Sequence, residues 1–170
     1  NGISEKFPTD TSRSLYGTSK LASEYLVQEY ATAYGLKAVI NRCGVIAGPG
    51  QFGKIDQGVY TLWVARHFFN RDLKYTGFGG TGKQVRDLIH IDDLVLLLEK
   101  QIAKQTGRNA ETFNVGGGIN GSTSLLELTK ICEEITGNSV GMAREKESSS
   151  VDIPWYISDC SKVQSTFDWA

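Results

Sequence analysis

Hydrophobic positions recur at helical spacing near the start of the chain. Between residues 15 and 34 the apolar and aromatic side chains return every three or four positions, at Leu21, Ala22, Tyr25, Leu26, Tyr30 and Ala33. This spacing is the period of an amphipathic helix. Gly35 follows directly, and glycine readily ends a helix because it tolerates the left-handed conformation. We therefore predict one long helix over residues 15–34.

Four short segments, three of them rich in β-branched residues, predict strands further along the chain. They are KAVINRC at 37–43, LKY at 73–75, VRDLIHI at 85–91 and ETFNV at 111–115. Runs of this kind are typical of strands when glycines or turn residues bound them. The stretch GVIAGPGQFGKIDQG at 44–58 is rich in turn residues, and its length favours a functional loop over a simple connector.

Helical patterns separate these strands. Amphipathic helices are predicted at 59–69 and 92–104, and Asp92 or Asp93 is expected to cap the second of them. Because strands alternate with helices, we predict an α/β fold with a partly parallel sheet.

Two further helices are predicted near the C-terminus. The first opens with a capping box of Ser124 and Glu127 and ends at Gly137. The second is short, and Asp159 or Ser161 is expected to cap it.

Composition narrows the class of protein. A chain of 170 residues allows one domain with a hydrophobic core and is too short for two of ordinary size. Its net charge of −1 and the lack of a basic block argue against nucleic acid or an anionic membrane as partner, which leaves small molecules. No apolar run is long enough for a membrane span.

Cysteine and histidine usage argues against a metal site. Cys43, Cys132 and Cys160 are odd in number and far apart, which favours reduced thiols in the cytoplasm. With two histidines and no CxxC or HExxH pattern, no bound metal is expected. The polar lead NGISEKFPTDTSRS starts at Asn1 and not at methionine, so we expect the chain to be cut from a longer protein.

Three glycine patterns imitate nucleotide-binding loops. GxGxxG occurs at 48–53, 77–82 and 116–121. The middle one nearly spells a P-loop, but Gln84 stands where a magnesium-binding Ser or Thr is needed, and a strand pattern follows it instead of a helix. The other two also lack the full context of a dinucleotide fingerprint. We interpret all three as tight turns.

Tyr16 and Lys20 form the most specific chemical signal. They stand one turn apart on the predicted helix, so their side chains project from the same face and can act on one ligand. An ammonium beside a phenol stabilises the phenolate, which is what a general base for a sugar hydroxyl requires.

The order of three motifs extends this signal over nearly the whole chain. YGTSK at 16–20 is followed by RCGVIAGPGQ at 42–51 and by VRDLIHIDDL at 85–94. This set resembles the extended short-chain dehydrogenase/reductase family, which includes the NAD-dependent epimerases and dehydratases, and looks most like its CDP-paratose 2-epimerase group. FNVGGG and DIPWYISDCSKVQ are also similar to the C-terminal region of that family.

The resemblance implies the C-terminal part of a Rossmann-like fold in a single truncated unit, 1–170. Residues 1–60 and parts of 85–115 would supply the last strands and helices of the parallel sheet, including the YxxxK helix. The remainder would form a small subdomain that binds the nucleotide sugar. In this family the glycine fingerprint, the ribose-binding acid and a helper Ser or Thr precede YxxxK, so the chain alone is expected to be inactive.

The resemblance also assigns roles to single residues. Tyr16 would be the catalytic acid/base, and Lys20 would bind the nicotinamide ribose of NAD. Cys43 and Val45 would pass beside the nicotinamide with their backbone, while the Cys43 side chain itself packs in the strand.

Arg86 would bind the pyrophosphate of the substrate, with an ion pair to Asp87 or a nearby acid as the alternative. Gln51 and Gln57 are candidate sugar or phosphate contacts.

Other polar residues of these motifs are interpreted differently. His90 and Asp92 are expected to be structural, and His67 to pack. Many family members carry an arginine where Ser149 stands here, three positions before Asp152, and Arg144 is a candidate replacement.

The implied activity is that of a nucleotide-sugar epimerase, with a CDP-hexose 2-epimerase favoured, that acts through transient oxidation by NAD to a keto intermediate. A 4,6-dehydratase or a 4-epimerase is the alternative within the family. A non-catalytic nucleotide-sugar-binding fragment is the alternative of another class. The resemblance further implies a homo-oligomer.

Overall fold

The structure, a computed structural model, describes residues 2–10, 14–54, 58–104, 109–150 and 152–169. Along the chain its elements are α1 (Leu15–Tyr34), β1 (Ala38–Cys43), β2 (Val45–Ala47), α2 (Val59–Phe68), β3 (Leu73–Thr76), the 3₁₀ turn η1 (Phe78–Gly80), β4 (Val85–His90), α3 (Ile91–Ala103), β5 (Asn109–Val115), β6 (Ser122–Ser124), α4 (Leu125–Thr136), β7 (Met142–Glu145), β8 (Trp155–Tyr156) and α5 (Ser161–Phe167). The predicted α/β class is confirmed.

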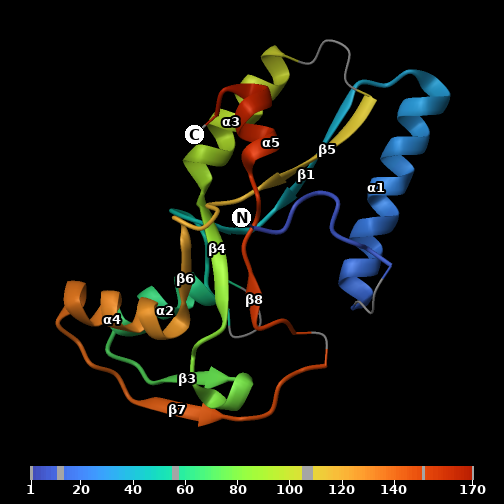
Figure 1. Cartoon of the computed structure of the whole chain (residues 1–170). Coiled ribbons are helices and arrows are strands. Elements are labelled where there is room, and N and C mark those ends of the chain that lie inside the picture. The colour runs from blue at the N-terminus through green and yellow to red at the C-terminus, as the bar shows by residue number, and fades with distance from the viewer. Residues whose placement is uncertain (1, 11–13, 55–57, 105–108, 151, 170) are drawn as a thin grey trace.

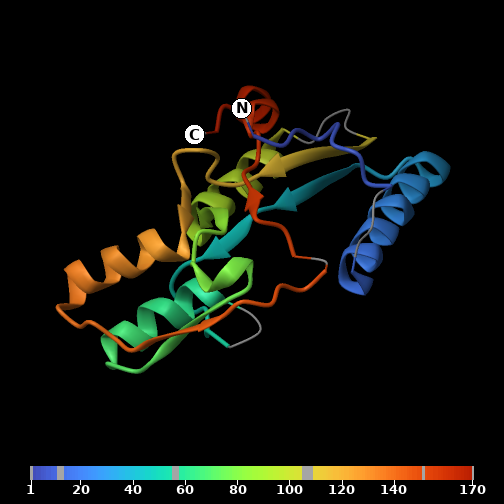
Figure 2. The same cartoon turned by 60° about the horizontal axis from the view of Figure 1, so that its bottom comes forward.

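Most strand pairs are parallel. β1 pairs with β5, β3 with β7, and β4 with both β2 and β8, all in parallel, while β6 runs antiparallel to β4. In Figure 1, β4 extends from the part of the molecule that holds α3, α5, β1 and β5 toward the part that holds α2, α4, β3 and β7. Figure 2 shows the same division from another side.

Each of these two parts has its own hydrophobic core. The first core is centred on Phe113 of β5, Leu97 of α3 and Phe167 of α5, none of which has exposed surface. The second is built around Trp63 of α2 and Tyr75 of β3, whose rings stack with centroids 5.7 Å apart. That the two cores correspond to a cofactor-binding part and a sugar-binding part stays a prediction.

The helix caps differ in part from the sequence expectation. α3 begins at Ile91, and its cap is His90, whose Nδ1 accepts a hydrogen bond from Asp92 N at 3.3 Å. Asp92 and Asp93 therefore lie in the first turn, where a carboxylate is favoured by the helix dipole, and neither is the cap. The His90 side chain thus bonds the backbone, which agrees with the structural role expected for it.

At the last helix, Ser161 is the first helical residue and Cys160 holds the cap position. The Asp159 carboxylate still accepts the Ser161 N–H at 3.0 Å. Of the two expected caps, Asp159 thus bonds the helix end, and Ser161 lies inside the helix.

Candidate functional site

Tyr16 and Lys20 lie side by side on α1. The helix begins just before them, and the hydroxyl of its cap, Ser14, accepts a hydrogen bond from Gly17 N at 3.1 Å. Lys20 Nζ lies 5.2 Å from the centre of the Tyr16 ring. Tyr16 is 70% exposed, so the pair faces away from the core. The juxtaposition that the spacing predicts is present, and the catalytic roles stay predictions.

Cys43 and Val45 lie where β1 passes into β2. Alternate residues of a strand share a face, so Cys43 lies on the face of Asn41, whose amide bonds Gln101 of α3 at 2.8 Å. At the strand end, however, the Cys43 side chain is exposed, which corrects the expectation that it packs inside the strand. Val45 packs against the second core. That the backbone of these two residues contacts the cofactor stays a prediction.

A buried carboxylate, Asp87, joins the ends of β1 and β5 to the C-terminal segment. It has no exposed surface, and its Oδ2 accepts a hydrogen bond from Ser158 N at 3.1 Å. A Cβ atom at Gly116 would lie 2.1 Å from that oxygen, and one at Gly44 would lie 2.8 Å from Oδ1. Glycine is therefore required at both positions for close packing. The first glycine of the 116–121 pattern serves this junction.

A cavity of about 600 Å³ opens beside Arg86. Elements α2, β3, β4 and α4 contribute to its wall, which combines apolar and aromatic side chains with two guanidinium groups, those of Arg66 and Arg86. Arg86 Nη2 donates to Asp152 Oδ1 at 2.8 Å, and Nη1 donates to the Val85 carbonyl at 2.8 Å. Arg86 thus both forms an ion pair with a nearby acid and lines the cavity.

The aromatic wall of this cavity was not anticipated from the sequence. Tyr60 and Trp63 line it from α2, and both are almost fully buried. Trp63 Nε1 donates to Thr129 Oγ1 at 2.9 Å, and Tyr60 Oη donates to the Thr123 carbonyl at 3.3 Å. Burial raises the pKa of Tyr60 to about 12, against the lowering effect of Arg86. The signal available in the sequence was the three-residue spacing of the two rings.

The other candidate contacts lie elsewhere. The Gln51 amide bonds the elements on both sides of its loop: it donates to the Ile46 carbonyl of β2 at 2.9 Å and accepts from Thr61 Oγ1 of α2. Gln51 is not among the residues that line the cavity. Gln57 lies outside the described residues. Arg144, on β7, is also not part of the cavity lining, so its proposed replacement role is not supported by its position.

His67 is a packing residue, as expected. It has no exposed surface, and its Nδ1 donates to the Trp63 carbonyl at 2.8 Å. Within the described ranges, no three His, Cys, Asp or Glu side chains group in a way that could hold a metal ion. Across the same ranges, no helix combines the length and apolar character needed to cross a bilayer.

With this geometry in place, comparison with known proteins identifies the class. The family described as the NAD dependent epimerase/dehydratase family matches residues 2–116, and the chain belongs to it. This confirms the resemblance drawn from the motif order.

Two individual relatives are similar to the chain over nearly all of its length. The chain is 32% identical to the CDP-paratose 2-epimerase of Salmonella typhi over an alignment of 173 residues, which covers all of this chain and 50% of that enzyme. It is 31% identical to a dTDP-glucose 4,6-dehydratase of Xanthomonas campestris over 163 residues, 91% of this chain and 44% of that enzyme. The chain thus spans about half the length of these relatives.

Solved structures agree on the fold. The UDP-glucuronic acid 4-epimerase of Bacillus cereus, in complex with UDP-glucuronic acid and NAD, superposes with a TM-score of 0.86 at 23% identity, over all of this chain and 51% of that one. At this identity the match establishes the fold alone, which is part of the Rossmann-like fold of the extended family.

Proposed function

We propose that the protein is a nucleotide-sugar epimerase that inverts one hexose carbon by transient oxidation with NAD, and that its substrate is a CDP-hexose inverted at C2. The observation that carries this proposal is the Tyr16–Lys20 pair on α1, with Lys20 Nζ 5.2 Å from the Tyr16 ring, in a chain of the epimerase/dehydratase family. The similarity to a CDP-paratose 2-epimerase over the whole chain supports the choice of base and carbon.

In the proposed reaction Tyr16 accepts one proton and later returns it. Its phenolate oxygen accepts the proton of the sugar hydroxyl as that carbon is oxidised to a ketone, and returns it to the oxygen when the carbon is reduced from the other face. Tyr16 is a neutral phenol while the ketone exists, and the Lys20 ammonium beside the ring favours the phenolate that begins and ends the cycle. NAD, when bound, supplies hydride acceptance and return. The net change is one inverted carbon.

The residues present fit one end of NAD better than the other. Tyr16 and Lys20 are open to a ribose and nicotinamide. The first glycine of the 116–121 pattern serves close packing against Asp87. The 77–82 pattern also packs tightly, because a Cβ atom at Gly82 would lie 2.6 Å from the Tyr75 ring. We therefore propose that the dinucleotide phosphates are held by parts of the family domain outside the described residues, and that this chain alone does not turn over substrate.

The cavity beside Arg86 is the proposed nucleotide site. Two guanidinium groups suit a pyrophosphate, and an aromatic wall suits the flat face of a base or sugar. Exposed apolar side chains along α1 support association with a second copy or with the rest of the family domain. The three free thiols support a reducing compartment such as the cytoplasm.

Calorimetric titration of this chain with CDP and with NAD tests the nucleotide site. We expect CDP to bind, and Arg86→Gln to weaken that binding at least about tenfold because a charge-assisted bond to phosphate is lost. Lys162→Gln on α5, outside the cavity lining, is the control and is expected to bind CDP as the parent chain does. Equal CDP affinity in the parent and Arg86→Gln would contradict this assignment.

A solvent-deuterium experiment tests the reaction in the full-length protein that carries this chain. An epimerase of this kind returns the same hydride, so the inverted carbon of a CDP-hexose should gain no deuterium from D₂O. The 4,6-dehydratase alternative, favoured by the 31% identity to a dTDP-glucose 4,6-dehydratase, predicts a product lighter by one water. A lighter product, or CDP binding without any conversion, would contradict the epimerase proposal.

A further inference from the structure

The helix that bears Tyr16 and Lys20 has little apolar contact with the rest of the protein. Of the residues of α1, Ala31 is the one that is buried, and Tyr25 and Leu26 are 58% and 61% exposed. Figures 1 and 2 both show α1 at one side of β1 and β5, away from the other helices. Burial of apolar surface therefore contributes little to holding this helix against the sheet in a fixed position.

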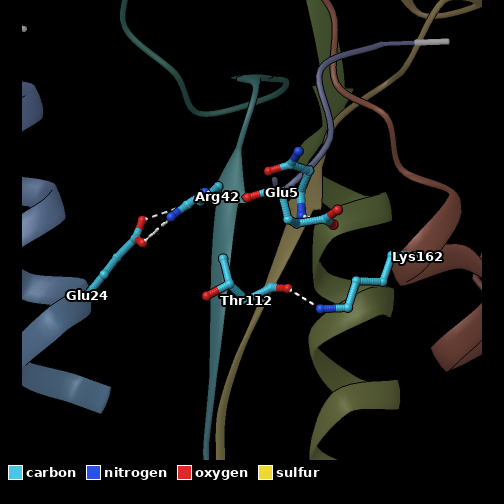
Figure 3. Close-up of polar contacts among 6 residues, drawn as sticks. Glu5, Glu24, Arg42, Thr112 and Lys162 are labelled. Carbon is cyan, nitrogen blue, oxygen red and sulfur yellow. Dashed lines mark hydrogen bonds and ion pairs between the residues drawn. The ribbon is translucent and has the colours of Figure 1, made fainter. Parts of the chain in front are cut away.

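A bidentate ion pair connects α1 to β1. Arg42 Nε donates to Glu24 Oε1 at 2.9 Å, and Arg42 Nη2 donates to Glu24 Oε2 at 2.7 Å. Figure 3 shows the Glu24 carboxylate on α1 pointing to the guanidinium of Arg42 on β1. The side chains are 26% and 16% exposed for Arg42 and Glu24 respectively, so solvent screens this pair less than a surface pair. Two parallel bonds of this type fix orientation as well as distance.

The strand side of this pair is itself held in place. Arg42 Nη1 approaches the Glu5 carbonyl at 3.4 Å, and the Glu5 carboxylate accepts the backbone N–H of Asn114 at 2.8 Å. Arg42 and Asn114 are direct neighbours in the β1–β5 register. The Arg42 guanidinium therefore extends from a strand that is held by its pairing with β5 and by Glu5. Its position is fixed independently of α1.

The position of Glu24 on the helix links this pair to the chemistry. Tyr16, Lys20 and Glu24 stand at successive four-residue intervals, which place them in one row along α1. Tyr16 lies eight residues before Glu24, about 12 Å along the helix axis. The proposed nicotinamide contacts follow Arg42 closely in the chain: Cys43 is the next residue and ends β1, and Val45 begins β2. A rotation or slide of α1 about this pair would displace the phenol from the strand end.

We propose that Glu24 and Arg42 are positioning residues, which fix the rotation and height of α1 so that Tyr16 and Lys20 face the end of β1. This proposal rests on the proposed function of Tyr16 and Lys20. Neither residue of the pair is assigned a contact with substrate or cofactor; both act through the helix.

Hydrogen exchange of the chain tests the anchor independently of activity. In Glu24→Gln the amides of α1 are expected to exchange at least about tenfold faster than in the parent, because the helix loses its ion pair to the sheet. Those of β1 and β5 are expected to keep their rates, because the two strands remain paired with each other. Lys162→Gln is the matched control. Lys162 lies on α5 and donates to the Thr112 carbonyl of β5 at 2.7 Å, so this substitution removes a cation that bonds the same sheet and leaves α1 unchanged. Unchanged exchange in α1 of Glu24→Gln would overturn the proposal.

Kinetics of the full-length protein separate positioning from simple loss of structure. In Glu24→Gln we expect kcat for the nucleotide sugar to fall about 10–100-fold with KM within twofold, because a displaced acid/base slows the chemical step. The double exchange Glu24→Arg with Arg42→Glu can re-form the pair in reverse and is expected to recover at least half of the lost factor on a logarithmic scale. Arg42→Lys keeps the charge without the fork and should resemble Glu24→Gln.

Two outcomes have distinct meanings. Faster exchange in α1 with an unchanged kcat, or no recovery in the double exchange, would overturn the positioning role and leave the proposed function intact. A parent protein that binds CDP but never converts a nucleotide sugar would overturn the proposed function, and the positioning role with it.

Discussion

Burial fixes the protonation state of Tyr60 in the cavity wall. Its pKa is raised to about 12, mainly by burial, and the unfolded value is about 10. A group of this kind keeps its proton more tightly in the folded state, so its contribution to stability is fully present below pH 10 and is lost as pH rises toward 12. We therefore expect the free energy of unfolding to fall between pH 10 and 12.

Urea unfolding of the protein and of Tyr60→Phe at several pH values checks this expectation. At pH 8 the variant should be less stable by about 1 kcal/mol, because the bond to the Thr123 carbonyl is lost. Above pH 10 the difference should shrink, since only the tyrosine protein carries the titration. Curves that stay parallel up to pH 12 would show that burial does not act on this phenol.

At the level of single residues, local spacing was more informative than motif membership. The contact of Tyr16 with Lys20 follows from helix geometry alone, and it was predictable. The surroundings of Gln51 and the exposure of Cys43 depend on Thr61 and on where the strand ends, which no local pattern encodes. The pairing of Arg86 with Asp152 joins residues 66 positions apart and could be foreseen only as an unspecified nearby acid.

The capping box at the start of α4 is the clearest local stabiliser of an element. Ser124 Oγ accepts the Glu127 N–H at 3.2 Å, and Glu127 Oε2 accepts the Ser124 N–H at 2.8 Å. These bonds hold the pKa of Glu127 below its usual value. A lowered pKa means that the carboxylate stabilises the fold above its unfolded pKa, and that this contribution is lost as pH falls through the folded value.

Ser124→Ala should therefore lower the free energy of unfolding by about 1 kcal/mol at pH 7, and the loss should become smaller in acid as Glu127 is protonated. Denaturant unfolding at pH 7 and pH 3 measures both effects. Ser165→Ala, on the exposed surface of α5, is a control that removes a serine hydroxyl without a cap. Equal stability of Ser124→Ala and the parent at pH 7 would refute the assigned role of the box.

The long helices were predictable from sequence, and several short strands were not. α1 has the predicted bounds because its period, its cap and Gly35 agree. β6 and β8 contain three and two residues, and a segment such as STS has no strand pattern of its own. These segments are strands because β4 offers backbone partners on both of its edges, which is a property of the tertiary structure.

In the whole molecule, two hydrophobic cores meet along β4. The two candidate sites lie on different elements. Arg86 and the cavity belong to the part around α2 and α4, whereas Tyr16 and Lys20 stand on α1 at the side of β1 and β5 (Figure 1). The sequence indicated both sites through motif order. Their separation depends on strand pairings between distant segments, which the sequence alone does not reveal.

This arrangement makes the two functions separable by mutation. Tyr16→Phe removes only the oxygen that holds the proton, on a residue that is 70% exposed and outside the cavity lining. CDP affinity should therefore stay within twofold of the parent value. Phenylalanine at this position is not expected to disturb the helix, because its ring has the same shape.

The most direct measurement is kcat for a CDP-hexose and NAD in the full-length protein that carries this chain, with Tyr or Phe at position 16. The account predicts that Tyr16→Phe lowers kcat by about 10²–10⁴-fold, the usual contribution of a positioned acid/base. Turnover by Tyr16→Phe at the parent rate would contradict it.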